Sequence, residues 1–85
     1  MKIAYSPGFV RKFKKLDPLL QKEVIEKIEL FKRPVNHKQL DVHKLHGPLA
    51  GAYSFAVNYR VRIIFDRVSR DEFFLTAIGD HDVYK

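Results

Sequence analysis

The chain has 85 residues, of which 46% are apolar and 31% charged, a composition that fits one globular domain and excludes a disordered tail. It has no cysteine, which excludes a disulfide framework, a thiolate metal site and a cysteine nucleophile. Lys and Arg outnumber Asp and Glu by 16 to 10, and the net charge of +6 favours a polyanionic partner over a merely soluble basic surface.

We expect a single domain over residues 1–85, with its place in the cytoplasm. The longest apolar run is too short to cross a bilayer, which needs about 20 residues. The N-terminal residues also lack the charged, apolar and small-residue segments of a signal peptide.

The N-terminal part predicts a short strand followed by two helix starts. Residues 1–5 alternate enough to form the strand. Ser6 before Pro7 is typical of an N-cap followed by the first helical position. Asp17 before Pro18 repeats this signal, so the two helices should form an αα-hairpin with almost no linker.

Apolar residues recur at helical spacing in both segments, so each helix should bury one face. The expected inward residues are Phe9, Val10, Phe13 and Leu16 in the first helix, and Leu20, Val24, Ile28 and Phe31 in the second, with Ile25 and Leu30 widening the face. Pro34 should end the second helix at or before Arg33.

The second half predicts a polar connection and then strands. Residues 34–50 are polar and contain a Gly-Pro turn signal. Apolar residues then recur with period two over 52–57, 60–67 and 72–78, which indicates three strands joined by short turns. We therefore expect an α+β fold with an N-terminal strand, an αα-hairpin and a three-stranded antiparallel sheet, the helices packed on the twisted sheet.

The strand predicted at 60–67 carries two arginines. Period two places Val61, Ile63 and Phe65 under the helices and puts Arg60 and Arg62 together on the other face. Two guanidinium groups side by side can hold a phosphate bidentately. The alternative is that both are ordinary polar residues of an exposed sheet face.

Histidines are the candidate proton-transfer groups, because an unperturbed pKa of about 6.5 suits acid–base catalysis near neutrality. His81 follows the last predicted strand between Asp80 and Asp82, which could hold its tautomer; the alternative is an inert surface histidine. His43 and His46 are three residues apart and could share one side of a short helical turn.

A metal site built from His43, His46, Asp80 and His81 is a weaker hypothesis, because the paired ligand motifs of zinc sites are absent. We therefore expect neither a metal nor another cofactor. Tyr84 could stack on a nucleobase or cover the edge of the core.

The chain resembles the RelE/ParE superfamily of type II toxins over essentially its whole length. The resemblance lies in the segments HKLHGPLAG (43–51), VNYRVRIIF (57–65) and AIGDHDVY (77–84). They resemble a Leu-x-Gly-x-Leu-x-Gly segment, an Arg-apolar-apolar-aromatic strand and a Gly-x-His tail with a tyrosine. The similarity is greatest to the YoeB, YafQ and RelE branch, whose members cleave messenger RNA.

The resemblance implies roles for particular residues. His43 matches a catalytic histidine or glutamate, Arg62 a phosphate-binding arginine that stabilises the transition state, and His81 a histidine that acts on the leaving group. His46 falls where many members have a phosphate-contacting lysine. We place His46 with Lys44, Arg60 and Tyr84 as substrate-binding residues, although a solvated loop explains Lys44 equally well.

The sequence departs from the family pattern on one strand. Ser54 and Ala56 stand where many members have arginines, and we expect Arg60 to compensate from the adjacent strand.

The implied function is ribosome-dependent, metal-free cleavage of mRNA through the ribose 2′-OH. The implied partners are mRNA on the ribosome and an antitoxin segment that covers Arg60, Arg62 and His81. Two alternatives are a ParE-like inhibitor of DNA gyrase and an inactive basic module that binds RNA or a partner. Damage to transcripts or to gyrase distinguishes the first two, and insensitivity to mutation of His43 and His81 identifies the third.

Overall fold

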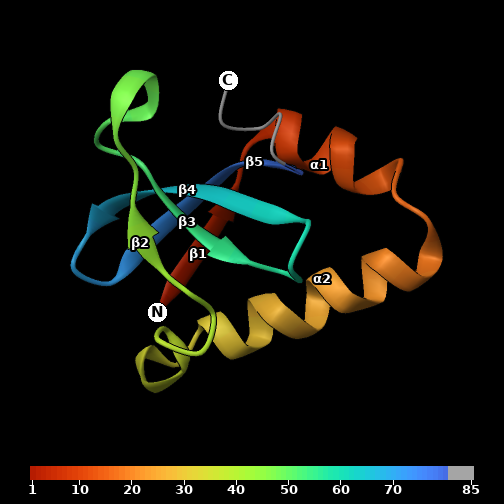
Figure 1. The fold of residues 1–85 in the computed structure, drawn as a ribbon, viewed down its shortest axis with the longest axis horizontal. Helices are drawn as coiled ribbons and strands as arrows, with labels where there is room; N and C mark the ends of the chain where they lie inside the picture. Colours follow the sequence, from red (N-terminus) through yellow and green to blue (C-terminus); the bar gives the residue numbers. More distant parts are fainter. Residues whose placement is uncertain (81–85) are drawn as a thin grey trace.

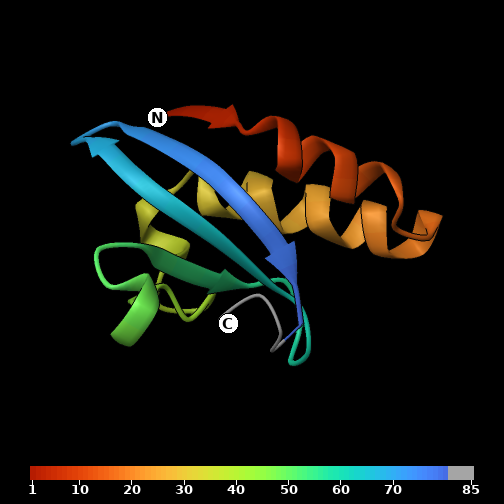
Figure 2. The same ribbon diagram turned by 90° about the horizontal axis from the view of Figure 1, so that it is seen from above.

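The computed structural model describes residues 1–80 (Figure 1). In chain order its elements are β1 (Lys2–Tyr5), α1 (Pro7–Lys14), α2 (Pro18–Phe31), the 3-10 helix η1 (Pro34–Asn36), β2 (His43–Lys44), the 3-10 helix η2 (Gly47–Leu49), β3 (Tyr53–Ala56), β4 (Arg62–Ser69) and β5 (Glu72–Gly79). The strands form one five-stranded mixed sheet in the order β1-β5-β4-β3-β2. Figure 1 and Figure 2 show α1 and α2 joined by a short connection at one end of the molecule, with the strands toward the other end.

The α+β class, the N-terminal strand, the helical hairpin and the three later strands are confirmed, but the expected three-stranded sheet is too small. β1 joins the sheet in parallel with β5, through a register that pairs Lys2 with Glu72 and Tyr5 with Leu75. β2 adds the opposite edge, with His43 opposite Ser54. β1 pairs with a strand far away in the sequence, and β2 has only two residues. The alternation of apolar and polar residues within one segment reveals neither pairing.

Both predicted helix caps are present. The Oγ of Ser6 accepts a hydrogen bond from the backbone N of Phe9 at 3.0 Å, and Oδ1 of Asp17 accepts one from the backbone N of Leu20 at 3.0 Å. The Ser6 hydroxyl also donates to the backbone carbonyl of Thr76 on β5 at 3.1 Å. Ser6 therefore caps α1 and ties it to the sheet.

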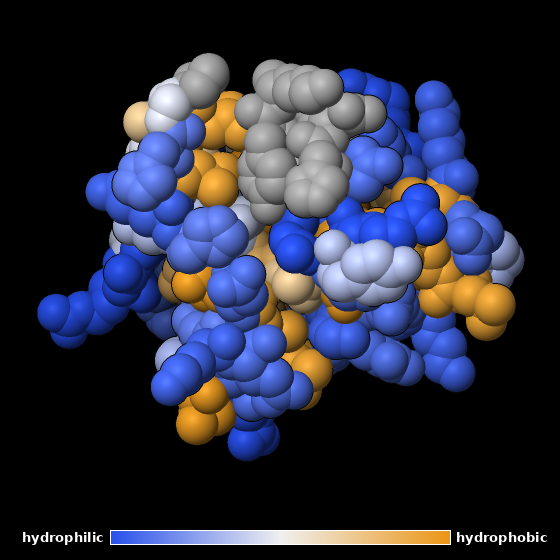
Figure 3. Space-filling view, viewed as in Figure 1, coloured by the Kyte–Doolittle hydropathy of each residue, from blue (hydrophilic) through white to orange (hydrophobic). Residues whose placement is uncertain are grey.

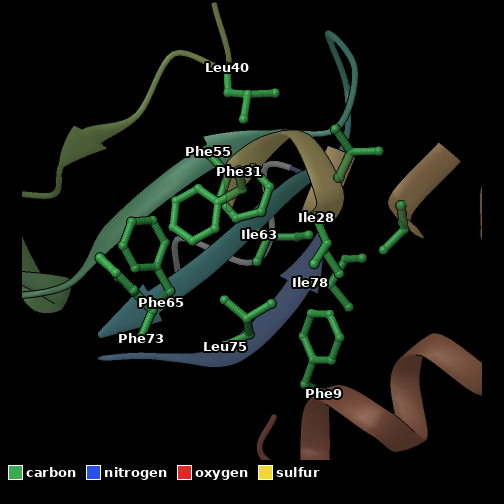
Figure 4. Packing of buried hydrophobic residues seen from close by; sticks show 12 residues of the cluster. Phe9, Ile28, Phe31, Leu40, Phe55, Ile63, Phe65, Phe73, Leu75 and Ile78 are labelled. Carbon is green, nitrogen blue, oxygen red and sulfur yellow. The ribbon is translucent and has the colours of Figure 1, made fainter. Parts of the chain in front are cut away.

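The core lies between the helices and one face of the sheet, and Phe31 at the end of α2 is at its centre (Figure 4). Its ring stacks on Phe55 with centroids 4.4 Å apart and meets Phe65 and Phe73 edge-on at 4.9 and 5.4 Å. Two expected core residues are not buried, since Val10 is 36% and Ile25 53% exposed. They lie on the flank of the hairpin, which the sheet does not cover.

A bulge in β5 adjusts which side chains reach the core. Ile64 pairs with Ala77 but the next residue, Phe65, pairs with Leu75, so Thr76 is an extra residue on β5. Leu75 and Ile78 consequently both belong to the core although they are three residues apart. The hydroxyl of Thr76 donates to the carbonyl of Ile64 at 3.2 Å and closes the bulge.

We predict that the two cap residues contribute unequally to stability. Asp17→Ala should lower the free energy of unfolding by about 1 kcal/mol, the usual value for a lost cap. Ser6→Ala should cost about 2 kcal/mol, because it also removes the bond to Thr76. Urea denaturation of the two variants measures the difference, and equal losses would show that the hydroxyl bond to β5 contributes nothing.

Candidate active site

The face of the sheet opposite the helices carries His43 and Arg62, with buried Ser54 and Ile64 in the row that contains His43. The strand register aligns one row across four strands, His43, Ser54, Ile64 and Ala77, and a neighbouring row of Ala56, Arg62 and Gly79. Residues directly opposite in register project to the same face. His43 and Arg62 therefore project to the same face of the sheet from strands two apart.

Neighbouring strands lie about 4.8 Å apart and same-face residues about 6.7 Å apart along a strand, so the Cα atoms of His43 and Arg62 are separated by about 12 Å. Both residues project to the same face of the sheet, and each side chain is held by backbone carbonyls of its own end of the face. Figure 3 shows hydrophilic side chains over most of the face seen in Figure 1, with an apolar area at the end where α1 leads into α2.

His43 on β2 is held through both of its ring nitrogens. Its Nδ1 lies 2.9 Å from the backbone carbonyl oxygen of Asp41 and 3.9 Å from Oδ2 of the same residue. Its Nε2 lies 3.4 Å from the hydroxyl of Ser54. A carbonyl oxygen can only accept, so the neutral ring carries its proton on Nδ1 and presents an unprotonated Nε2. That nitrogen can accept a proton from a substrate.

The segment before His43 is shaped for this contact. Asp41 has a backbone φ of 57°, in the left-handed region that non-glycine residues seldom adopt. The carbonyl of Leu40, a buried residue, accepts from the backbone N of Ala56 at 2.8 Å and fixes the segment to β3. The turn thus brings the Asp41 carbonyl onto the histidine ring.

Asp41, His43 and Ser54 lie next to one another like the Asp, His and Ser of a catalytic triad, but they cannot act as one. Ser54 has no exposed surface, so its hydroxyl is closed to a substrate carbonyl or phosphate. His43, whose side chain is 46% exposed, is the accessible member. The arrangement therefore supports a base at His43 and not a serine nucleophile.

Arg62 is half-buried at the start of β4. Its Nη1 donates to the backbone carbonyls of Asn58, through a short bond, and of Val61 at 3.4 Å. Within residues 1–80 its guanidinium makes no further hydrogen bond or ion pair, so the edge formed by Nε and Nη2 keeps its donors. This is the edge through which an arginine binds phosphate bidentately.

Arg60 does not share the strand face with Arg62, so that expectation is wrong. β4 begins at Arg62, and Arg60 is exposed in the preceding turn. The cause is Asn58, whose Oδ1 accepts from the backbone N of Arg60 at 2.8 Å and of Val61 at 2.7 Å and so bends the chain before the strand starts. Arg60 instead lines a groove with Lys12 of α1.

His43 and His46 do not share a helical turn. His43 is in a strand and His46 has the extended angles φ −122° and ψ 173°. Lys44 lies opposite Tyr53, on the other side of β2 from His43. Both Lys44 and His46 are exposed beside this site, without a place in the row that contains His43.

Three predicted residues, His81, Asp82 and Tyr84, lie outside the described residues. Asp80, the last described residue, is exposed. Over residues 1–80 no group of three or more His, Cys, Asp or Glu side chains is arranged to hold a metal ion. In the same part of the chain, neither helix has the length and apolarity that a membrane span requires.

Sequence reasoning missed Asp41, Ser54 and Asn58 as parts of the site. Asn58 had a local signal, since asparagine commonly bonds backbone groups just after it in turns. Asp41 and Ser54 had none, because their contacts with His43 depend on the pairing of β2 with β3.

No family model matches the chain, and no curated protein matches it. Solved structures do match, and they define the fold as that of the RelE/ParE toxins. The YoeB–YefM complex from Staphylococcus aureus aligns with a TM-score of 0.73 and 20% identity, over 95% of this chain and 97% of the other.

Two further solved structures share the fold. The YoeB/ParE toxin from Agrobacterium tumefaciens has a TM-score of 0.68 and 15% identity, over 95% of this chain and 99% of the other. YafQ from E. coli has a TM-score of 0.67 and 14% identity, over 96% and 94%. The RelE-like fold expected from the sequence is confirmed by these alignments.

We predict that neutral His43 carries its proton on Nδ1, because the Asp41 carbonyl accepts from that atom. Long-range ¹H–¹⁵N NMR correlations of the imidazole ring report the tautomer directly. His46 is the matched control, since no hydrogen bond to its ring is found within residues 1–80 and its tautomers should be mixed. A proton on Nε2 of His43 would contradict the assignment of that atom as the accepting nitrogen.

Proposed function

We propose that this protein is the toxin of a type II toxin–antitoxin pair and cleaves mRNA on the ribosome. The observation that carries the proposal is the presence, on one sheet face, of His43 with an unprotonated Nε2 and of Arg62 with the donors of its Nε–Nη2 edge. A base and a phosphate-binding cation are the groups that 2′-OH attack on RNA requires.

In the proposed reaction His43 acts as the general base. Its Nε2 takes the proton of a ribose 2′-OH, and the oxygen attacks the adjacent phosphorus. The bond to the 5′-oxygen breaks and that oxygen takes a proton from His81, the proposed general acid. The products are a 2′,3′-cyclic phosphate, which water can open to a 3′-phosphate, and a free 5′-OH. Such a mechanism acts on RNA and fails on DNA.

Charge neutralisation falls to Arg62, whose Nε–Nη2 edge would bind the non-bridging oxygens as negative charge develops. Arg60, Lys44 and His46 would bind flanking phosphates, and Tyr84 would stack on a base. The scheme needs no metal or other cofactor, because side chains supply both proton transfers and the positive charge. The ribosome would align the transcript, which places the reaction in the cytoplasm.

An antitoxin is the second proposed partner. The YoeB structures of the same fold include a heterotetrameric YoeB–YefM toxin–antitoxin complex from Staphylococcus aureus. A basic chain with a net charge of +6 favours a segment that carries acidic residues. We propose that such a segment covers Arg60, Arg62 and His81 and blocks the site.

A translation reaction with mapping of mRNA ends tests the ribonuclease. Wild-type protein should produce ribosome-dependent cuts, and His43→Ala and His81→Ala should each slow cleavage by about 10²- to 10⁴-fold, the usual contribution of a general base or acid. Lys38→Ala, an exposed change in the connection before β2, is the matched control and should cleave like wild type.

Intact mRNA with wild-type protein would reject the ribonuclease and direct the next assay to DNA gyrase. Cuts that persist at full rate in both histidine variants would reject the assigned roles. Binding of RNA without cleavage would favour the inactive module.

The chemistry also predicts sensitivity to a single oxygen atom. Replacing the 2′-OH at one mapped cleavage site with hydrogen should abolish the cut at that bond, because the nucleophile is removed. Sequencing of the ends of such a substituted transcript measures this, and neighbouring cuts serve as the internal control. Cleavage that continues at the substituted bond would require water as the nucleophile and would contradict the mechanism.

A further inference from the structure

Asn58, in the turn between β3 and β4, is bonded through both polar atoms of its side chain. Its Nδ2 donates to Oε1 of Glu23 on α2 at 2.7 Å. Its Oδ1 accepts from the backbone N of Arg60 at 2.8 Å and of Val61 at 2.7 Å. The amide therefore fixes the turn and ties it to the second helix.

The same turn holds Arg62. The backbone carbonyls of Asn58 and Val61 both accept from Nη1, at one end of the guanidinium group. A guanidinium is planar, so bonds at Nη1 orient the opposite Nε–Nη2 edge as well. The position of the Asn58 carbonyl thus sets the direction in which Arg62 offers its open donors.

We propose that Glu23 and Asn58 are positioning residues for Arg62, an inference that rests on the proposed function. Neither side chain contacts the phosphate in this scheme. Glu23 holds Asn58, Asn58 shapes the turn, and the turn carbonyls hold the guanidinium ready for substrate. Preorganisation of this kind lowers the entropy that a long side chain loses on binding.

The bond to Glu23 exceeds what the turn alone requires. Contacts from Oδ1 to the next backbone N–H groups already satisfy an asparagine turn. The contact to Glu23 joins residues 35 positions apart and is a charge-assisted bond between half-buried groups. It locks the turn against a helix, which suits a site that needs fixed geometry.

Cleavage kinetics of the full chain on ribosomes test the inference. Glu23→Ala should lower kcat by about 10- to 100-fold with little change in KM, the size of effect that a small misplacement of a catalytic group produces. Glu23→Gln should retain most activity, because its Oε1 still accepts from Asn58. Glu26 is exposed and lies about one helical turn after Glu23 on α2. Glu26→Ala is therefore the matched control and should leave kcat unchanged.

A double-mutant cycle separates positioning from a general effect on the fold. In an Arg62→Ala background, Glu23→Ala should produce no further loss of kcat, because its effect acts through the arginine. Equal losses in both backgrounds would overturn the inference and leave the proposed ribonuclease intact.

NMR of the free protein decides the inference without RNA cleavage. The guanidinium resonances of Arg62 should be those of a fixed group in wild type and in Glu23→Gln, and should average in Glu23→Ala. Unchanged resonances in Glu23→Ala would overturn the inference whether or not the protein cleaves RNA. Failure of wild type to cleave, with the expected NMR result, would instead reject the proposed function and keep the anchoring of Arg62.

Discussion

The packing of Phe31 against the sheet is the contact on which the rest of the structure depends. Its ring lies among Phe55, Phe65 and Phe73 and also stacks on His37 with centroids 4.8 Å apart. The Nε2 of His37 in turn lies 2.8 Å from the Phe31 carbonyl, so the end of α2 and the segment after it are fixed together. That segment leads through buried Leu40 to His43, which connects the core directly to the candidate base.

The aromatic core also determines the character of the opposite sheet face. Because strand residues alternate, large side chains at Phe55, Ile63 and Phe65 leave Ser54, Ala56 and Arg62 on the other side. Ser54 and Ile64 on that side are themselves buried, so a polymer would meet the ends of this face and not its centre. The polar groups that can act on it come from the ends of the strands, where turns hold them.

Local signals in the sequence predicted local structure well. Ser6 with Pro7 and Asp17 with Pro18 gave both helix starts, because a cap and a proline act within one turn of chain. The parallel pairing of β1 with β5 was not predictable from alternation, since it joins residues 70 positions apart. The two-residue strand β2 was missed for the same reason, as its partner alone defines it.

The candidate site divides along the same line. His43 and Arg62 were named from residue type and resemblance, and the register now places both on one face. The tautomer of His43 and the orientation of the Arg62 guanidinium were not predictable, because both depend on backbone carbonyls. The Asp41 carbonyl determines the tautomer, and the Asn58 carbonyl determines the orientation. Every residue has a backbone carbonyl, so the residue type does not reveal where that carbonyl will lie in the fold.

The face that carries Arg62 has few cationic side chains, because Ser54 and Ala56 are uncharged and Arg60 lies elsewhere. Ser54 and Ala56 lie on the same face as His43 and Arg62, where the resemblance would place arginines. Arg60 does not compensate from the strand, because it lies in the preceding turn, where it lines a groove with Lys12. In the proposed mechanism, neutralisation of the phosphate on the described face would therefore rest on Arg62. A single cation in that role would tolerate little error in its direction, and the bonds from Asn58 to Glu23 and from Arg62 to the Asn58 carbonyl would limit that error.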